Sequence, residues 1–553
     1  MHRTASILRR KYSAVAAVAA AACALIFLGA AGPGDAPADE TARDLRTILS
    51  TGKLPELNDG ELDFAALRAF YAAMAYKPVW SGSATAENES RTMLAALSRA
   101  PDDGLDASDY HAGTDVLRRA HDAPLAAAAF DVLLTDGALK FARDLRQGRP
   151  EAKADRDVDL PGGRFDPRAS LAAALETHAL AAFLAGLAPP QPEYARLRFA
   201  LRRYRDIAAE GGWPMLEKAE TDRLFSDAAL SALLRRRLAY EDASASSDAD
   251  LADAVKRFQL RHGLKADGRV GGQTLRALNV PASERVLEII ANMERWRWMP
   301  RTFEDRYVAV NVPDARLDLI ADGKIVLSSR VIVGRRRGPT PILRAVASSV
   351  TINPPWNVPA TIARKEILPK LKSNPAYLAS QNMVLLNGPP DDPNGLHIDW
   401  KAVPAARFPY QIQQLPGPTN ALGQIKLELP NRFAVYLHDT PAKGAFDLDQ
   451  RYLSHGCVRV QDIKALASYA LAGDVTSAVA DIDTAVAAGT TQHLPLGTPL
   501  PIYLLYWTAF ADDYGAVEFR DDIYGRDRRL LDALAKRAPH QQVTLAVMQC
   551  RPA

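Results

Sequence analysis

The hydrophobic period of this chain changes near residue 300, and this change most restricts how the chain can fold. Before it, apolar residues recur at helical spacing, as in 64–71 and 133–145. After it, Val308, Val310 and Val312 alternate with smaller or polar residues, as in a half-buried strand. A chain of 553 residues is too long for one hydrophobic core. We therefore predict a multidomain α+β protein with a helical first part and a β-rich last part.

The helical part is predicted to extend over residues 39–242. Clusters of Pro and Gly, such as Pro161-Gly162-Gly163, separate its helices. It carries no catalytic signature, and the run Arg235–Arg237 is more typical of a solvated helix face than of a binding patch. We expect a helical scaffold domain whose role is support or contact with partner proteins.

A linker rich in Ser, Ala and Asp at 243–248 leads into a compact unit at 249–282. Leu251, Val255 and Phe258 lie at helical spacing, so they can line one face of its first helix. Glycines and a turn separate this helix from a second, shorter one. The pattern predicts a small helical domain.

The β-rich part is predicted to extend over 300–510. Strand patterns flank a hairpin signal at 321–324 and resume at 433–437. Between them, 356–420 is irregular and rich in Pro, Gly and Asn, which indicates a capping subdomain inserted between strands. Residues 511–553 are expected to form a C-terminal hairpin and tail.

The N-terminus has the pattern of an export signal. Basic residues, including Arg9 and Arg10, precede an apolar run over 12–29, and Ala36-Pro37-Ala38 is a small-residue site that a signal peptidase can cut. Residues 1–38 are therefore expected to be a signal peptide. The alternative is an uncleaved membrane anchor, because the apolar run approaches the length of a membrane span. On either reading, the remainder of the chain lies outside the cytoplasm.

Charge and cysteine content restrict the function further. With 68 basic and 65 acidic side chains, the net charge of +3 gives no case for nucleic-acid binding. The three cysteines are Cys23, inside the apolar run, Cys457 and Cys550. A disulfide between the last two is disfavoured, because Cys550 lies on a polar tail and Cys457 has a chemical context of its own.

Cys457 lies in the run Ser454-His455-Gly456-Cys457-Val458-Arg459, which predicts a catalytic nucleophile. Neighbouring positive charge is expected to lower the pKa of its thiol. His438, at the end of a predicted strand, can act as the general base that takes the thiol proton and later returns it. Backbone N–H groups around Gly456 and Cys457 can hold a developing oxyanion.

Two residues of this run have alternative roles. His455 can shape the loop or position a substrate. Arg459 offers a planar fork for a carboxylate, but it fits equally well in an ion pair with Asp447, Asp449 or Asp462.

A third group should orient His438. Asp439 is adjacent, but neighbouring side chains on an extended strand point apart, so a backbone carbonyl is an equally good candidate. Zinc bound by His438, His455 and Cys457 is disfavoured, because no pattern supplies a fourth ligand. We expect no metal and no cofactor.

Two parts of the chain resemble known families. The unit at 249–282 resembles the peptidoglycan-binding domain of cell-wall enzymes, through Ala254–Leu264, Asp267–Gly271, Thr274–Leu275 and Leu278–Asn279, and this resemblance implies a small three-helix domain. The run around Cys457, with His438-Asp439-Thr440-Pro441 before it, resembles the catalytic signature of the L,D-transpeptidases, cysteine enzymes that remodel bacterial peptidoglycan. Further stretches resemble the large periplasmic members, which have an N-terminal scaffold domain: Phe70–Tyr71, Lys77–Trp80, Asp102–Leu105, Asp109–His111, Asn292–Trp298, Asn353–Pro359, Pro416–Pro418, Asn420–Gly423 and Val435–His438.

The resemblance implies a β-rich catalytic core, a capping subdomain and a defined reaction. Cys457 would attack the bond between the diamino acid of a stem tetrapeptide and its terminal D-Ala, releasing D-Ala and leaving a thioester. An amine of another stem would resolve the thioester and form a 3→3 cross-link. The partners would be peptidoglycan stem peptides and glycan, with other cell-wall synthesis proteins as candidates for the scaffold. The location would be the periplasm, with anchoring to the inner membrane as an alternative, and carbapenem-type inhibitors would acylate Cys457.

The predicted catalytic residues are thus Cys457, His438 and Gly456. The predicted substrate-binding residues are Trp356, Tyr436, Ser454, His455 and Arg459. Trp356 and Tyr436 match aromatic positions near the family's site, although packing in the core explains each of them equally well. The sequence departs from the family at Gln461-Asp462 and at Ile425–Leu429, without touching the predicted chemistry.

Two other functions remain compatible with these residues. Water could take the acyl group instead of an amine, which would make the chain an L,D-carboxypeptidase or endopeptidase. A non-catalytic peptidoglycan-binding wall protein is the third alternative, although the retained Cys457, His438 and Gly456 argue against it.

Overall fold

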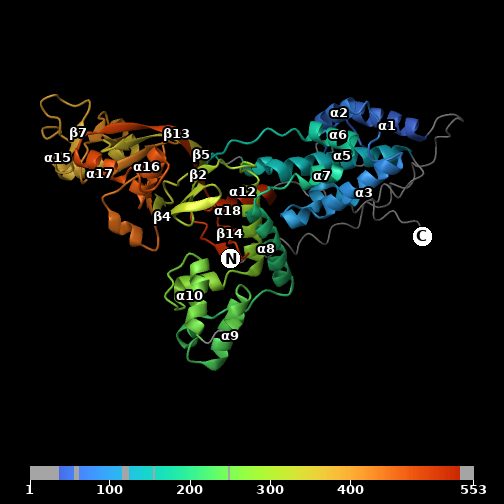
Figure 1. Ribbon diagram of the computed structural model, residues 1–553, viewed down its shortest axis with the longest axis horizontal. Coiled ribbons are helices and arrows are strands. Elements are labelled where there is room, and N and C mark those ends of the chain that lie inside the picture. The colour runs from blue at the N-terminus through green and yellow to red at the C-terminus, as the bar shows by residue number, and fades with distance from the viewer. Residues whose placement is uncertain (1–36, 55–61, 115–123, 154–155, 247–249, 536–553) are drawn as a thin grey trace.

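The computed structural model describes residues 37–54, 62–114, 124–153, 156–246 and 250–535 (Figure 1). The export signal predicted at 1–38 lies outside this part, apart from its last two residues, which begin α1 (Pro37–Thr51). Cys23 and Cys550 also lie outside it. None of the helices in the described ranges combines the length and apolar character that a membrane span requires.

The described residues form the multidomain α+β protein that the sequence predicts. Figure 1 shows a helical lobe, a smaller helical lobe and a β-rich lobe, which meet around α8, α12 and α18. The first lobe contains α1 and then α2 (Phe64–Ala73), α3 (Ala84–Ser98), α5 (Pro124–Gln147), α6 (Pro167–Glu176) and α7 (Leu180–Ala185). Its core forms around α5, whose Phe130, Leu134 and Phe141 are buried against the surrounding helices.

Two long helices, α8 (Pro192–Ala209) and α12 (Ala282–Trp296), pack against each other where the lobes meet. The charged residues of 284–297 favour an ordinary surface helix, but the structure buries most of the second half of α12. Polar residues can be buried here because they pair. Glu294 accepts hydrogen bonds from the backbone N–H of Arg149 (2.6 Å) and from the guanidinium of Arg297 (2.6 Å).

The smaller helical lobe contains α9 (Ala228–Ala239), α10 (Leu251–Arg261) and α11 (Gly272–Leu278). One buried cluster joins Leu234 and Leu238 of α9 to Phe258 of α10. The sequence assigns α9 to the scaffold domain. In the structure, the buried side chains of α9 pack against α10. The predicted linker is also partly ordered, because its first residues form a 3-10 turn, η6 (Ala243–Ser246), with Ala245 buried.

The β-rich lobe is a sheet that closes on itself. Its strand order is β1-β5-β13-β2-β3-β4-β12-β10-β9, and β9 pairs with β5 as well as with β10. The strands are β1 (Val158–Asp159), β2 (Arg306–Asn311), β3 (Arg316–Ala321), β4 (Lys324–Gly334), β5 (Ile342–Ile352), β9 (Ile425–Glu428), β10 (Leu437–His438), β12 (Val458–Val460) and β13 (Gln492–Leu505), with β11 (Tyr452–Ser454) pairing with β4. Strand β1 lies between α5 and α6 in the chain, and both of these helices belong to the first helical lobe. The chain therefore leaves that lobe, adds a short strand beside β5, and returns.

Two strands differ from the sequence expectation. Of the predicted strand at 433–437, only Leu437 pairs in the sheet, together with the following His438, because Ala434 has a positive φ of 53° and bends the chain. The C-terminal hairpin is β14 (Ala509–Ala511) with β15 (Val517–Phe519), whereas Leu504 and Leu505 end the long strand β13.

The insertion between β5 and β9 folds around its own core. It contains a small sheet of β6 (Trp356–Asn357), β8 (Ile412–Gln414) and β7 (Met383–Leu385), the short helices α13 (Ala360–Ile362), α14 (Leu368–Ser373) and α15 (Tyr377–Ser380), and a π-helical turn, η7 (Ala363–Ile367). Leu371, Leu378 and Trp400 are buried in that core. Further helices of this lobe are α16 (Ile463–Ala472), α17 (Val479–Ala487) and α18 (Arg526–Ala535).

Candidate active site

The strand register brings the predicted catalytic residues to one face of the sheet. In the parallel pair β10–β12, His438 is opposite Arg459, and in the antiparallel pair β9–β10 it is opposite Lys426. Directly opposed residues share a face, and so do residues two positions apart on one strand. Tyr436 and Cys457 are two positions before His438 and Arg459, so all five side chains belong to this face. The alternate residues are buried on the other face.

The loop that carries Cys457 is fixed by its own hydrogen bonds. Gly456 has a φ of +128°, which favours glycine. The carbonyl of Gly456 accepts a 2.8 Å hydrogen bond from the hydroxyl of Thr340. Ser454 Oγ donates to the carbonyl of Cys457 (2.5 Å) and accepts from the N–H of Gly456 (3.1 Å). Ser454 is buried, so these bonds assign its hydroxyl to the support of the loop instead of the predicted contact with substrate.

The Cys457 thiol lies among polar groups, and the residue is half-buried. Its Sγ is 3.9 Å from the carbonyl of Ala434, and it shares a hydrogen bond with the hydroxyl of Tyr436. Burial raises the pKa of the thiol, while Tyr436 and the charges of Lys426 and Arg459 act in the opposite direction. The net direction is opposite to the lowered pKa that the sequence predicts. The reason is that the sequence shows the neighbouring charges but not the burial.

His438 is buried and uncharged at neutral pH. Burial, followed by the positive charge of Arg459, lowers its pKa to about 3. Among the described residues, its Nδ1 has no hydrogen-bond partner and its side chain makes no hydrogen bond to Cys457. Its ring lies 5.5 Å from that of Tyr436 in an edge-on arrangement. The side chain of Asp439 does not orient His438. Its carboxylate accepts a hydrogen bond from the N–H of Gln424 (3.0 Å) and forms an ion pair with Lys443.

Arg459 is half-buried beside these two groups. Within the described ranges it forms no ion pair with Asp447, Asp449 or Asp462, and Asp447 is instead paired with Arg330 (2.9 Å). The Nε of Arg459 is buried without a hydrogen-bond partner. Burial lowers the pKa of this guanidinium. An unpaired cation at this position is available for an anionic group of a ligand.

Two aromatic residues connect the cap to the thiol. Trp356 of β6 and Tyr436 share a side-chain hydrogen bond, and Tyr436 in turn contacts Cys457. The ammonium of Lys426 lies 4.3 Å from the centre of the Tyr436 ring. Lys426 belongs to the segment Ile425–Leu429, whose departure from the family pattern was not expected to touch the chemistry. The structure corrects that expectation, since this charge acts on both Tyr436 and Cys457.

His455 points away from the thiol and toward the cap. Its Nε2 lies 2.5 Å from Glu366 Oε1 in η7, and Arg335 contacts both of them, at 2.8 Å from Glu366 and 2.5 Å from His455. These three residues form a link between the nucleophile loop, the β4–β5 loop and the cap. The sequence suggests two roles for His455, and these contacts favour shaping of the loop.

Sequence reasoning missed four residues that shape this site: Lys426, Thr340, Arg335 and Glu366. Lys426 could have been found by strand pairing, because it is opposite His438. No local signal marks the other three, because their contacts join segments far apart in the chain.

Comparisons with known proteins agree with this architecture. Residues 65–201 match the family model "Scaffold domain", 228–278 match "Putative peptidoglycan binding domain", and 305–486 match "L,D-transpeptidase catalytic domain". The second match begins at the start of α9, in agreement with the shared core of α9 and α10.

A curated protein of Haemophilus influenzae named "Putative L,D-transpeptidase" is 34% identical to the chain over 274 residues. The alignment covers 48% of this chain and 54% of the relative, so the chain spans about half the length of the curated relative that it matches. The chain therefore carries an L,D-transpeptidase catalytic domain, which a scaffold domain and a putative peptidoglycan-binding domain precede.

Proposed function

We propose that the chain is a cysteine-dependent L,D-transpeptidase that forms 3→3 cross-links in peptidoglycan. The observation that carries the proposal is the shared sheet face, on which the register aligns His438 with Arg459 and brings Cys457 and Tyr436 beside them. The match to the L,D-transpeptidase catalytic domain indicates the class of reaction. This face of the sheet supplies a side chain for each step of that reaction.

In the first step, Cys457 attacks the carbonyl of the diamino acid in a tetrapeptide stem. The thiol is protonated at rest, because burial raises its pKa, and His438 is neutral, because its pKa is about 3. A neutral imidazole can accept the thiol proton as the sulfur–carbon bond forms, which is general-base catalysis. No thiolate–imidazolium pair needs to exist before substrate arrives.

The developing oxyanion requires hydrogen-bond donors that are not already used. The N–H of Gly456 is bound to Ser454 Oγ, and the N–H of Val458 is bound to the carbonyl of Tyr436 (3.1 Å). The N–H of Cys457 is therefore the better candidate of the two groups that the sequence suggests. The hydroxyl of Tyr436 is a second donor on the same side of the thiol.

In the second step, the tetrahedral intermediate collapses to a thioester and D-Ala leaves. His438 returns its proton to the departing amine, which completes the proton transfer. Arg459 is proposed to bind a carboxylate of the donor stem through its guanidinium fork. A carboxylate there would neutralise the charge that lowers the pKa of His438, so substrate binding would make the imidazole a stronger base.

In the last step, the side-chain amine of a second stem attacks the thioester and restores the thiol. The cap is proposed to shape the path of this acceptor, since Trp356 reaches Tyr436 from the insertion and Glu366 holds His455. Trp356, Tyr436 and Arg459 are thus proposed as the residues that position substrate, and His455 is proposed to hold the nucleophile loop to the cap. Hydrolysis would differ only in that water takes the acyl group.

The helical domains are proposed to hold the enzyme at its polymeric substrate. The peptidoglycan-binding domain would bind the cell wall, and the scaffold domain would contact glycan or other wall-synthesis proteins. Together with the export pattern at the N-terminus, these domains support a periplasmic location.

Purified tetrapeptide muropeptides test the proposal. Incubation with the chain should give dimers with a direct bond between two diamino acids and release D-Ala, as seen by mass spectrometry, and the Cys457→Ala variant should give neither. Tripeptides without dimers would replace transfer by hydrolysis, and dimers formed by Cys457→Ala would reject the nucleophile. A carbapenem should add its mass to the wild-type chain and not to Cys457→Ala.

A further inference from the structure

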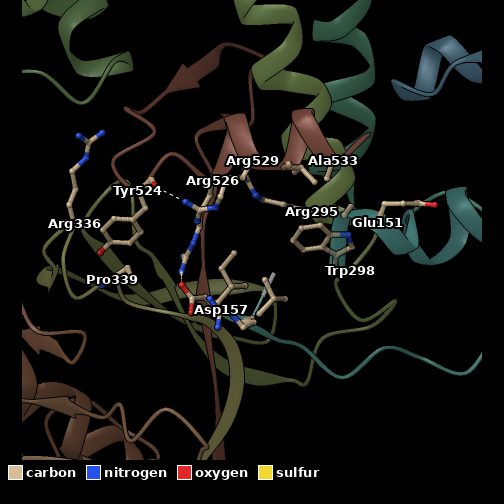
Figure 2. A pocket seen from close by; sticks show the side chains of 15 residues that line it. Glu151, Asp157, Arg295, Trp298, Arg336, Pro339, Tyr524, Arg526, Arg529 and Ala533 are labelled. Carbon is tan, nitrogen blue, oxygen red and sulfur yellow. Dashed lines mark hydrogen bonds and ion pairs between the residues drawn. The ribbon is translucent and has the colours of Figure 1, made fainter. Parts of the chain in front are cut away.

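A cavity of about 540 Å³ lies where the scaffold, α12, α18 and the β4–β5 loop meet (Figure 2). It is separate from the sheet face that carries His438 and the Cys457 thiol. Its lining includes Glu151, Asp157, Arg295, Trp298, Arg526 and Arg529. A volume of this size is typical of sites for small molecules.

The described lining is strongly basic. Five arginines belong to it, at positions 156, 295, 336, 526 and 529, alongside two carboxylates, Glu151 and Asp157. Arg526 Nη2 lies 3.6 Å from Asp157 Oδ2, which compensates one of these cations in part. Arg295 pairs with Asp527 outside the lining (2.5 Å).

Arg295 and Arg336 keep donor capacity for a ligand. Arg295 is almost fully buried, and its Nε has no partner among the described residues. Arg336 donates from Nε to the carbonyl of Ile523 (2.8 Å), and this bond positions the side chain without neutralising it. Positive charge in a partly enclosed space attracts anions, and the planar fork of arginine matches an oxyanion.

Apolar side chains complete the lining. Trp298, Ile342 and Leu530 contribute hydrocarbon surface next to the arginines. A ligand with one charged end and a compact apolar body matches this combination better than a bare monovalent ion.

We propose that this cavity is a binding site for a small oxyanion-bearing ligand, whose phosphate or carboxylate group is held by the arginines of α12, α18 and the β4–β5 loop. The proposal does not depend on the cross-linking reaction. It assigns a second ligand site to the chain, at the junction of its domains.

Occupancy of this site would bear on the nucleophile loop, because the two share supporting residues. Tyr524, in the cavity wall, donates from its hydroxyl to the carbonyl of Gly334 (2.5 Å), and Arg526 donates to the carbonyl of Thr340 (3.0 Å). Thr340 donates to the carbonyl of Gly456, the residue before Cys457. An anion bound by Arg526 would therefore be connected through Thr340 to the loop that carries Cys457.

Calorimetric titration of the full chain with inorganic phosphate and, separately, with citrate at constant ionic strength tests the proposal. The chain, its Arg336→Gln/Arg529→Gln variant and its Arg528→Gln variant are compared. Arg528 is the matched control, because it is an exposed arginine on the same helix outside the cavity lining. We expect at least one anion to bind, with affinity reduced about tenfold or more in the double variant and unchanged in Arg528→Gln.

The two anions distinguish the ligand chemistry. Binding of phosphate alone would assign a phosphate ligand, and binding of citrate alone a carboxylate ligand. Absence of binding by both, or equal affinity in the double variant and the wild type, would overturn the proposal. An equal loss in Arg528→Gln would also overturn it, since net charge and not the cavity would then be responsible.

Hydrogen exchange of the wild-type chain gives a localisation that needs no variant. The bound anion should slow exchange in 334–341 and 523–533, which line the cavity. Protection confined to other segments would reject this site even if calorimetry detects binding.

Discussion

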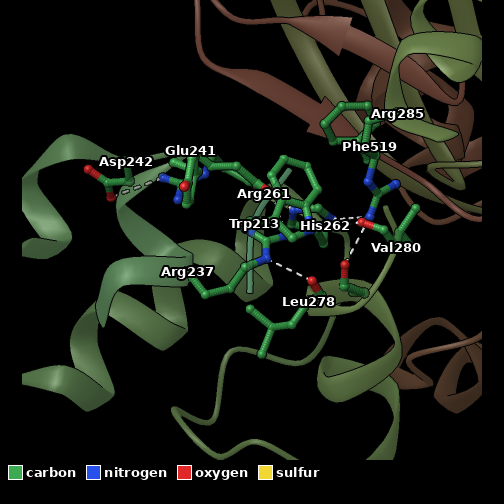
Figure 3. A network of polar contacts seen from close by, with 12 residues as sticks. Trp213, Arg237, Glu241, Asp242, Arg261, His262, Leu278, Val280, Arg285 and Phe519 are labelled. Atoms are coloured by element: carbon green, nitrogen blue, oxygen red, sulfur yellow. Dashed lines mark hydrogen bonds and ion pairs between the residues drawn. The ribbon is translucent and has the colours of Figure 1, made fainter. Parts of the chain in front are cut away.

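His262 Nε2 lies 2.8 Å from Glu241 Oε2 inside a buried polar network that joins the peptidoglycan-binding domain to α12 and the C-terminal hairpin (Figure 3). Glu241 also pairs with Arg237 (2.9 Å), and the His262 ring stacks between aromatic rings that include Phe519 of the C-terminal hairpin. The guanidinium of Arg285 covers the same Phe519 ring at 4.3 Å. The binding domain is therefore held by desolvated charges and aromatic contacts, and not only by its chain connections.

This network makes the docking of the binding domain sensitive to acid. Burial lowers the pKa of His262 to about 4, below its value near 6.5 in an unfolded chain, although the charge and hydrogen bond of Glu241 act in the opposite direction. The unfolded state therefore binds the proton first. The stabilisation is complete above about pH 6.5 and is lost as the pH falls toward 4, by up to about 3 kcal/mol.

Hydrogen exchange of α10, corrected for intrinsic rates, measures the free energy of opening this domain between pH 7 and 4.5. The His262→Gln variant should lose the part of the pH dependence that belongs to this residue. The exposed His397 provides the control, because His397→Gln should keep the wild-type slope. Equal slopes in wild type and His262→Gln would contradict this account.

Gly456→Ala should lower the rate of Cys457 acylation by at least about tenfold. The φ of +128° is strained for any residue with a Cβ, while the nearest atom to that Cβ is 3.6 Å away, so the cause is conformational and not a clash. The rate of carbapenem adduct formation measures it. Gly444→Ala is the control, since Gly444 has open space around it and no positive φ. Equal rates in the two variants would show that the backbone conformation at Gly456 is not required.

Thr340→Val should destabilise the nucleophile loop, although valine has nearly the same shape as threonine. The hydroxyl of Thr340 accepts from the N–H of Gly334 (2.9 Å) and donates to the carbonyl of Gly456 (2.8 Å), and the side chain is fully buried. Valine keeps the shape but leaves both backbone groups unsatisfied, which costs about 1–3 kcal/mol for each group. The free energy of opening of 454–458 by hydrogen exchange should fall accordingly, and Thr340→Ser should restore most of it. A valine variant with wild-type protection would remove Thr340 from this role.

The local patterns of the chain were predictable, and the contacts between distant segments were not. The periods of 64–71 and of the strand at 306–311 reflect burial of one face, which is a local property. Burial of α12 depends on partners such as Arg149 and Tyr194, which are far away in sequence. Strand β1 has only two residues, which is too short for an alternation of apolar and polar residues to indicate a strand.

The same distinction applies to the candidate site. The motif around Cys457 and the strand-end position of His438 are local, and the sequence places both. The direction of the thiol pKa depends on burial and on Tyr436, and the sequence gives the wrong direction because it shows only the nearby charges. The pairing of Glu366 with His455 joins the cap to the nucleophile loop. The two residues are far apart in the chain, so no local pattern predicts this contact.

Glu366→Gln should loosen the cap and change the use of substrate more than it changes stability. Glu366 accepts from His455 and pairs with Arg335, but it is partly exposed, so its contribution to the free energy of unfolding should be below about 1 kcal/mol. The apparent KM for the acceptor stem should rise several-fold, while the thermal midpoint stays close to that of the wild type. Asp391→Asn removes an exposed carboxylate elsewhere in the cap and should leave both quantities unchanged. An unchanged KM in Glu366→Gln would mean that the link does not govern the path of the acceptor.

Tyr436→Phe should move the ionisation of Cys457 to higher pH. The tyrosine hydroxyl hydrogen-bonds the sulfur and acts against the burial that raises the thiol pKa, so its removal leaves the thiolate less stabilised. Alkylation of Cys457 by iodoacetamide, followed across pH by mass spectrometry of its peptide, should show a midpoint at higher pH than in the wild type. Tyr452→Phe is the matched control, because this tyrosine is also largely buried but donates to the carbonyl of Pro313 (2.9 Å) and not to sulfur. If the two variants shift the midpoint equally, the hydroxyl of Tyr436 does not stabilise the thiolate, and its place as a second oxyanion donor loses its support.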